Sequence, residues 1–227
     1  MSYRSDEEQV AALKQWWNDN GTSLVVGVVL AAAAVFGWRS WQSYQRTNAE
    51  AASALYQSFL EATIAEADGD EEARATLGFV ANQLKSEYPN SAYASYSAFS
   101  LAREAVLADD LDVAEAELRW VLASRVTDTL KDIARLRLAR VLAARGIYDE
   151  ALELLDAVQG PGHRGSVEEA RGDILKALGD IEGAREAYAR ALEADPRTIS
   201  ANLIELKLAD VRKASDSAES PSGSVEQ

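Results

Sequence analysis

The hydrophobic pattern of the chain begins with one long uncharged stretch. No residue between Asp19 and Arg39 carries a charge, and the strongly apolar part covers residues 24–38. The stretch as a whole, residues 20–38, falls within the roughly 17–25 residues that a helix needs to cross the hydrocarbon of a bilayer. The pattern therefore indicates a transmembrane helix over residues 20–38.

Aromatic side chains lie on both sides of this stretch. From Trp17 to Trp38 an α-helix would extend roughly 31 Å, at about 1.5 Å per residue. That separation is close to the distance between the two aromatic belts at the surfaces of a bilayer. We expect five membrane-interface anchors: Trp16, Trp17, Trp38, Trp41 and Tyr44.

Two other interpretations of the stretch are a cleaved signal peptide and a buried helix of a soluble core. A signal peptide begins with a positively charged region, but here Arg4 and Lys14 are outnumbered by acidic residues. Ser5 and Glu8 also have the spacing of a capping box. These features favour a short amphipathic helix over residues 1–19 and an uncleaved anchor.

Beyond an aromatic and basic flank at residues 39–46, apolar residues recur at helical spacing almost to the end of the chain. No stretch alternates with a period of two, so we expect an all-α fold. Short polar or glycine-containing breaks divide the pattern into a succession of antiparallel helices. The breaks are Asp68-Gly69-Asp70, Tyr88-Pro89-Asn90, Asp109-Asp110, Gly146, Gly160-Pro161-Gly162, Gly179 and Asp195-Pro196.

The segment EARGDILKALGDIEGAREAYARALEADP matches the spacing of a tetratricopeptide repeat. In this repeat, small residues let two antiparallel helices approach closely and an aromatic side chain fills the gap to the next pair. The matching positions are Gly172, Leu175, Gly179, Ala184, Tyr188, Ala191 and Pro196. Glu168 and Arg171 depart from the usual aromatic and leucine.

Similar units precede this one. RLRLARVLAARGIYDEALELLDAV is a second copy, and a third, weaker copy has Asp109 in place of the turn glycine. A degenerate fourth pair is expected between Asn48 and Tyr88, and a terminal capping helix over residues 198–214. We therefore predict an N-terminal transmembrane helix followed by a tetratricopeptide-repeat-like helical solenoid over residues 47–214, with a disordered tail at 215–227. The alternative is an ordinary alanine-rich helical bundle.

The repeat register predicts which side chains face a partner. The first helix of each pair lines the concave face of a tetratricopeptide array, and apolar groups with interspersed arginines suit a peptide or a partner's helix. The predicted groove comprises Tyr96, Phe99, Arg103, Val106, Ile133, Leu136, Arg140, Glu169, Asp173 and Lys176. Phe99 and Leu136 are equally compatible with the core between helices, whereas the two arginines resist burial.

Composition and motifs argue against other functions. A formal charge of −14 does not suit nucleic acid, and the lack of cysteine excludes disulfides and thiolate metal sites. The single histidine, His163, lies in a turn, GPGHRG, without a second catalytic group beside it, and this glycine-rich loop lacks the lysine of a phosphate-binding loop. We expect a protein that is not an enzyme, with no cofactor, no metal and no catalytic residue.

Charge does not orient the predicted membrane helix. Cytoplasmic flanks of such helices are rich in lysine and arginine. Here Arg4 and Lys14 precede the helix, while Arg39 and Arg46 follow it. The count is level, so these residues leave both orientations open.

With its segments placed, the chain resembles the YfgM-like ancillary subunits of the bacterial Sec translocon. The resemblance rests on QVAALKQWWNDNG before the apolar stretch, GWRSWQSYQ after it, and ARLRLARVLAARGIYDEAL and EEARGDILKALGDIEGARE in the repeats. It covers nearly the whole chain up to the tail, and the order of these segments is more specific than any one repeat.

This resemblance implies a single-pass protein of the bacterial inner membrane, with a short cytoplasmic N-terminus and a periplasmic repeat domain. It also implies two partners, the Sec translocon channel and a membrane-anchored periplasmic chaperone with a parvulin-like domain. Translocating polypeptides are a further candidate, and the role would be to assist folding or trafficking of newly translocated proteins. Two alternatives stay open: a membrane-tethered scaffold for another envelope or division complex, and a reversed topology with a cytoplasmic domain.

Overall fold

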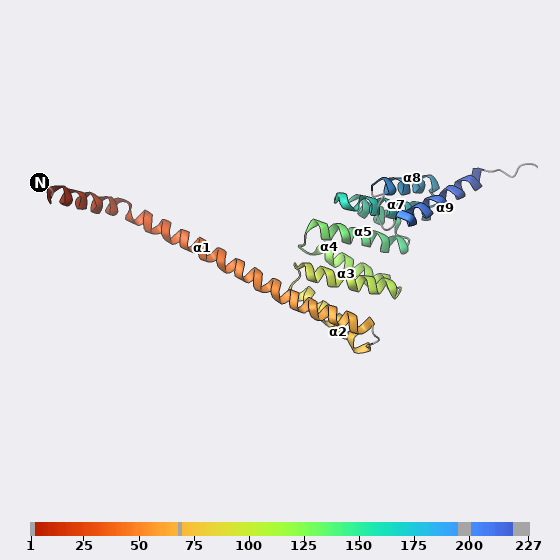
Figure 1. The fold of residues 1–227 in the computed structure, drawn as a ribbon, viewed down its shortest axis with the longest axis horizontal. Coiled ribbons are helices and arrows are strands. Elements are labelled where there is room, and N and C mark those ends of the chain that lie inside the picture. The colour runs from red at the N-terminus through yellow and green to blue at the C-terminus, as the bar shows by residue number, and fades with distance from the viewer. Residues whose placement is uncertain (1–2, 68–69, 195–200, 220–227) are drawn as a thin grey trace, which may run out of the picture. The chain divides into compact units, whose positions relative to one another are not determined.

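The fold was analysed in a computed structural model, which describes residues 3–67, 70–194 and 201–219. All elements in these residues are helical, as the pattern predicts. They are α1 (Tyr3–Ala67), α2 (Glu71–Glu87), α3 (Ala92–Leu107), α4 (Leu111–Ala123), α5 (Asp128–Ala144), α6 (Tyr148–Asp156), the 3-10 helix η1 (Pro161–His163), α7 (Arg164–Ala177), α8 (Ile181–Ala194) and α9 (Ala201–Glu219). The chain divides into two units, Met1–Ala51 and Ala52–Gln227 (Figure 1).

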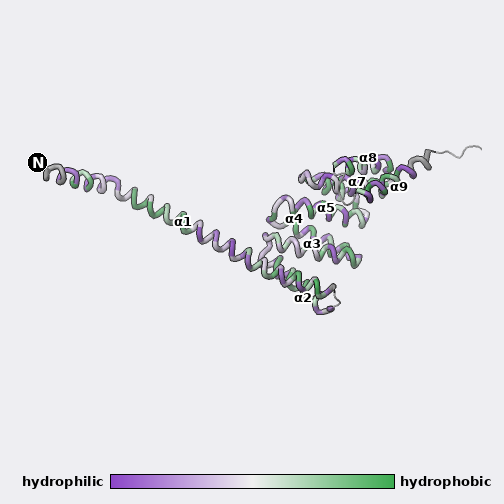
Figure 2. Tube along the Cα trace, viewed as in Figure 1, coloured by the Kyte–Doolittle hydropathy of each residue, from purple (hydrophilic) through white to green (hydrophobic). Residues whose placement is uncertain are grey.

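The first unit consists of the N-terminal part of α1, which contains the apolar stretch (Figure 2). Within the described residues, one helical segment, Glu7–Glu66, is long and apolar enough to cross a membrane. Its apolar side chains are exposed, from Leu24 at 44% to Phe36 at 68%. A helix of a soluble core would bury these groups, so their exposure favours a membrane span over that interpretation.

The helix α1 continues through Asn20 and Gly21, although both residues often end helices. The Asn20 side-chain amide donates a hydrogen bond to the Trp16 carbonyl, 3.2 Å away. The Trp17 indole lies over Gly21, where a Cβ atom would come within 3.1 Å of the ring. Local side-chain contacts therefore keep the expected lead-in helix and the apolar stretch in a single helix.

The second unit is a succession of antiparallel helical pairs. Helices α3 and α4, α5 and α6, and α7 and α8 pack pairwise, and the first helices of successive pairs, α3, α5 and α7, also contact one another. The C-terminal part of α1 and α2 form the pair expected between Asn48 and Tyr88, around a core that includes Phe59 and Leu84. The described structure confirms the all-α, tetratricopeptide-like fold class.

The repeat register is visible in the burial of the second helices. Ala114, Ala151 and Ala184 are fully buried where each second helix crosses the first. One turn later, the packing positions are almost fully buried in all three copies, and they are Leu118, Leu155 and Tyr188. The small residue thus sets the approach of the two helices, and the large one fills the space beside it.

In the last pair this fit is tight. Gly172 in α7 faces the Tyr188 ring, and a Cβ at residue 172 would lie 2.5 Å from it. The Tyr188 hydroxyl donates a hydrogen bond to Asp173, 2.8 Å away. Burial raises the pKa of Tyr188, and the adjacent Asp173 carboxylate raises it further. The phenol therefore stays neutral across the physiological pH range.

Each of the three clear pairs turns through the same backbone motif. Asp109, Gly146 and Gly179 have positive φ angles of 59°, 77° and 85°. The amide of the next residue bonds back to the carbonyl five residues earlier, at 2.8 Å for Asp110 and 2.9 Å for Ile147. These are Schellman turns, in which glycine is usual because it has no Cβ. Asp109 occupies the glycine position, as its place in the weaker copy suggests.

One turn has no signal in the sequence. The chain leaves α4 at Ser124 and enters α5 after Thr127 without a glycine or a proline. The Arg125 amide donates a hydrogen bond to the Asn90 side chain, 3.2 Å away, in the loop between α2 and α3. This long-range contact adds to the local hydrogen bonds of Ser124 and Thr127 at the two ends of the connection.

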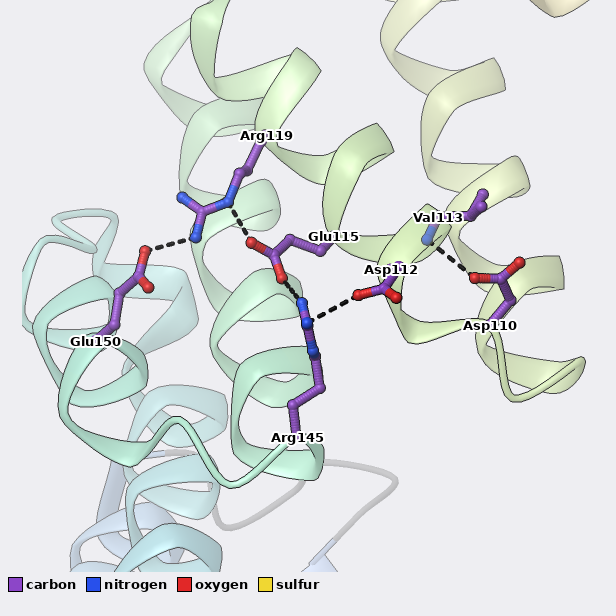
Figure 3. Close-up of polar contacts among 7 residues, drawn as sticks. All are labelled: Asp110, Asp112, Val113, Glu115, Arg119, Arg145 and Glu150. Carbon is purple, nitrogen blue, oxygen red and sulfur yellow. Dashed lines mark hydrogen bonds and ion pairs between the residues drawn. The ribbon is translucent and has the colours of Figure 1, made fainter.

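Ion pairs link α4 to the following pair on the surface shown in Figure 3. Glu115 accepts hydrogen bonds from both Arg119 and Arg145. Arg119 reaches Glu150 at 2.6 Å, and Arg145 reaches Asp112 at 2.8 Å. Single exposed ion pairs add little stability, but this group of five charges joins α4, the end of α5 and α6.

A buried carboxylate holds the linker between α6 and α7. Asp132 in α5 is 2% exposed, and its Oδ2 atom accepts the amides of Gly160 at 2.8 Å and Gln159 at 3.3 Å. Arg135 donates to Oδ1 at 2.6 Å. Burial raises the pKa of Asp132, but these donors outweigh burial and leave the pKa below its ordinary value.

The last helix closes the core at the C-terminal end of the array. Ile204, Leu208 and Val211 share its buried face, as their spacing predicts. The helix α9 continues to Glu219, so the first residues assigned to the disordered tail are helical. Residues 220–227 of that tail, residues 198–200 of the predicted capping helix and the Asp195-Pro196 break lie outside the described residues.

We expect Asp109→Gly to stabilise the repeat domain. A left-handed residue other than glycine costs about 1–2 kcal/mol, less for aspartate, so the gain should be about 0.5–1 kcal/mol. Gly146→Ala is the matched reverse change and should lower the free energy of unfolding by about 1–2 kcal/mol. Urea unfolding in mild detergent, followed by circular dichroism, measures both. A destabilised Asp109→Gly variant would contradict the role of this turn.

We expect Asp132→Asn to destabilise the protein by about 1.5–3 kcal/mol at pH 7, because it weakens hydrogen bonds to a charged group. The folded-state pKa of Asp132 is lowered, so its contribution is present above the unfolded pKa of about 3.9 and disappears as pH falls through the folded pKa. The stability gap between wild type and variant should therefore shrink below about pH 4.

Urea unfolding between pH 7 and pH 3 tests this dependence on Asp132. Glu193→Gln, which changes an exposed carboxylate near the end of α8, is the control and should show no such gap. A gap for Asp132→Asn that stays constant down to pH 3 would show that its charge does not stabilise the linker.

Candidate partner-binding pocket

A surface pocket of about 320 Å³ lies between α3, α4 and α5. We call it the arginine pocket, because three arginines line an otherwise apolar wall. Its residues are Phe99, Ala102, Arg103, Val106, Leu107, Leu111, Leu118, Arg137, Arg140, Val141 and Ala144. Four of the predicted groove residues meet here: Phe99, Arg103, Val106 and Arg140.

The helical register explains how these side chains converge. Phe99, Arg103 and Val106 follow one another at three- and four-residue spacing on α3, so they share a face. Phe99 is almost buried at 7% exposed, whereas Val106 is 45% exposed and the adjoining Leu107 is 67% exposed. The pocket therefore has an apolar floor and an apolar rim that stays in contact with water.

The arginines of the pocket differ in their partners. Arg103 pairs with Glu104 at 2.5 Å, and Arg140 pairs with Glu169 at 3.5 Å. The Arg137 guanidinium lies over the Phe99 ring, 4.8 Å from its centre, at a distance typical of a cation–π contact. Partial burial lowers the pKa of Arg137, and the positive charge of Arg140 lowers it further.

A second pocket of about 370 Å³ lies between α5, α6 and α7. Its lining comprises Arg140, Ala143, Ala144, Tyr148, Ala170, Asp173, Ile174 and Ala177. Both pockets include Arg140 and Ala144, so they adjoin along α5. The second pocket brings one more predicted residue, Asp173, into the same hollow surface.

The predicted residues on α7 are engaged within the fold. Lys207 of α9 lies 2.8 Å from Glu169 and 2.8 Å from Asp173. Lys176 pairs with Asp210, also on α9, at 2.5 Å. Glu169 is 8% exposed. These side chains connect α7 to the last helix, which leaves fewer of their polar atoms for a partner.

Three other predicted residues lie outside both pockets. Tyr96, 42% exposed, belongs to an aromatic cluster with Tyr56 and Tyr93, at ring-centre distances of 5.9 and 6.4 Å. Leu136 is buried at 7% exposed, and Ile133 is half-buried against the same core. The structure thus places Leu136 between the helices.

Seven lining residues of the arginine pocket were missed from the sequence: Ala102, Leu107, Leu111, Leu118, Arg137, Val141 and Ala144. Arg137 follows Ile133 by four residues and precedes Arg140 by three, which is the spacing of one helix face. The predicted register assigned that face to Leu136 instead. The spacing of Arg137 therefore indicated the pocket face of α5, but the choice between Leu136 and Arg137 depended on the position of Phe99 on α3.

The structure also locates the remaining predicted groups. The membrane-interface anchors Trp16, Trp17, Trp38, Trp41 and Tyr44 are all about half exposed or more, and the Trp38 and Trp41 rings lie 5.3 Å apart. Among the residues that the structure describes, no three histidine, aspartate or glutamate side chains are placed to hold a metal ion.

Comparison with known proteins places this architecture in a family. A tetratricopeptide repeat-like domain matches residues 14–213. Three similar proteins bear the name ancillary SecYEG translocon subunit. The protein of Aggregatibacter actinomycetemcomitans is 34% identical over 93% of this chain and 98% of its own. That of Escherichia coli (strain K12) is 32% identical over 91% and 96%.

The third, from Haemophilus influenzae (strain ATCC 51907 / DSM 11121 / KW20 / Rd), is 31% identical over 84% of this chain and 91% of its own. In all three cases the similarity extends over most of both chains. The chain therefore belongs to the tetratricopeptide repeat-like family and, within it, to the family of the ancillary SecYEG translocon subunits.

Proposed function

We propose that this protein is a non-enzymatic, membrane-anchored subunit that associates with the Sec translocon and binds protein partners beside it. The observation that carries the proposal is the similarity to relatives named ancillary SecYEG translocon subunits over almost their full length. Similarity of this extent covers the apolar helix and the repeats together. A repeat domain shared with unrelated proteins would match only the repeats.

The apolar part of α1 supports a membrane anchor. Its side chains from Leu24 to Phe36 are exposed, and aromatic residues lie at both ends, as at the two surfaces of a bilayer. In the proposed topology the N-terminus is cytoplasmic and the repeat domain periplasmic, with residues 20–38 in the inner membrane.

The pockets support a function in binding. Most of the wall of the arginine pocket is apolar, and its ionisable groups are guanidinium groups. Arginine stays protonated in proteins and donates hydrogen bonds, which makes it a poor acid or base. Such a surface suits a polypeptide segment, and the proposed partners are a periplasmic chaperone with a parvulin-like domain and translocating polypeptides.

The membrane anchor would make this binding more effective by holding the pocket beside the channel. A pocket held beside the channel by a membrane helix meets an emerging chain at a high effective concentration, which raises occupancy without any new contact. In this way the protein would assist folding or trafficking of newly translocated proteins without chemistry of its own.

We expect the full-length protein, tagged at its C-terminus and purified in mild detergent, to recover the Sec channel subunits and the parvulin-like chaperone. Quantitative mass spectrometry measures this recovery against a tagged single-span inner-membrane protein of similar abundance. Recovery of an envelope or division complex without the channel would instead identify a scaffold for another assembly.

We expect a reporter enzyme that is active only outside the cytoplasm to be active when fused after Gln227. The same reporter fused before Met1 should be inactive, because the short N-terminal segment stays cytoplasmic. Protein levels of the two fusions are compared by immunoblot. The reverse pattern of activities would place the repeat domain in the cytoplasm.

A further inference from the structure

We propose that the arginine pocket selects a polypeptide segment that combines a carboxylate with large apolar side chains. The carboxylate pairs with Arg137, and the apolar side chains contact Phe99, Val106 and Leu107. This inference rests on the proposed function and deepens it, because it defines the chemistry of the segment that the protein binds.

The charge of the pocket is opposite to that of the whole chain. The formal net charge is −14, yet three arginines and no acidic residue line the pocket. Glu104 and Glu169 pair with Arg103 and Arg140 from outside the lining, although Glu169 is shared with Lys207. For Arg137, the described part of the structure shows the Phe99 ring as its contact and no carboxylate.

The position of Arg137 favours an acidic ligand. Its charge and that of Arg140 repel each other, and this repulsion lowers the pKa of Arg137 in addition to the larger effect of its partial burial. A carboxylate bound at this point would reduce the repulsion and would accept two parallel hydrogen bonds from one guanidinium. Because the guanidinium already stacks on Phe99, little side-chain freedom is lost on binding.

The rest of the pocket favours apolar side chains. Its volume of about 320 Å³ is at the lower end of the roughly 300–1,000 Å³ of typical ligand pockets. Leu107 and Val106 expose large apolar surfaces beside it, and burying such surface is the main driving force of association. A purely acidic segment would leave these surfaces in water.

The same features discriminate against basic segments. A lysine or arginine in the ligand would meet Arg137 and Arg140 across an apolar wall, where repulsion is poorly screened. The pocket should therefore rank otherwise identical apolar segments by charge, with acidic segments first, neutral ones second and basic ones last.

The test uses the full-length protein in mild detergent and three fluorescein-labelled ten-residue peptides. The peptides alternate leucine with glutamate, glutamine or lysine; the glutamate and glutamine peptides are nearly identical in shape and differ in charge, and the lysine peptide reverses the charge. Fluorescence anisotropy should show the glutamate peptide binding about ten-fold more tightly than the glutamine peptide, and the lysine peptide binding more weakly than either. Equal affinities for the glutamate and glutamine peptides would overturn the inference.

Variants of the protein test whether Arg137 causes the preference for the glutamate peptide. Arg137→Gln should bring the affinities for the glutamate and glutamine peptides to within about two-fold of each other. Arg137→Lys should retain part of the preference for the glutamate peptide. Val106→Gln should lower the affinities for both peptides by the same factor, because it removes apolar contact. Arg125→Gln, which changes an exposed arginine outside the pocket, is the control for net charge and should leave the affinities unchanged.

The outcomes separate this inference from the proposed function. A glutamate preference that survives in Arg137→Gln would overturn the pocket assignment, even if the wild-type protein recovers the Sec channel. Failure of the wild-type protein to recover the channel would overturn the proposed function, whereas a preference lost in Arg137→Gln would still support the pocket. Thermal melts by circular dichroism establish that each variant is folded before its peptide affinity is compared.

Discussion

The close approach of paired helices is the constraint on which the repeat domain depends. Ala114, Ala151 and Ala184 have no exposed surface, and at Gly172 even a single Cβ would collide with the Tyr188 ring. With backbones this close, a larger side chain must displace a helix rather than a neighbouring side chain. The small residues therefore fix the spacing of each pair, and through it the position of the next.

The arginine pocket is a consequence of that spacing. The second helix α4 buries Ala114 and Leu118 against the first helices on both sides, which brings α3 and α5 into contact. In this arrangement the Arg137 guanidinium lies 4.8 Å from the centre of the Phe99 ring. A change in helix packing far from the pocket would therefore alter the shape of the pocket, because the pocket is formed between pairs rather than within one helix.

Local requirements made much of this fold predictable from the sequence. The positive φ angles at Gly146 and Gly179 favour a residue without a Cβ, and glycines at these two positions mark the turns in the sequence. The turn before α5 was harder to predict, since it contains no glycine or proline and one of its hydrogen bonds goes to Asn90, 35 residues away from Arg125. The same limit applies to the pocket: periodicity assigns a face of α5, but the choice between Leu136 and Arg137 is made by a residue on α3.

The arginines of the repeat domain differ in what they contact. Most arginines near the repeats have carboxylate partners, as in the group around Glu115 (Figure 3). The lysines between α7 and α9 are paired with carboxylates in the same way. In an acidic chain such partners are plentiful, so a cation that contacts an aromatic ring instead needs a structural reason. The apolar wall around Arg137 supplies that reason, because a carboxylate buried against it would lose its hydration. A ligand carboxylate brings its own apolar neighbours to the pocket, and their burial offsets that loss.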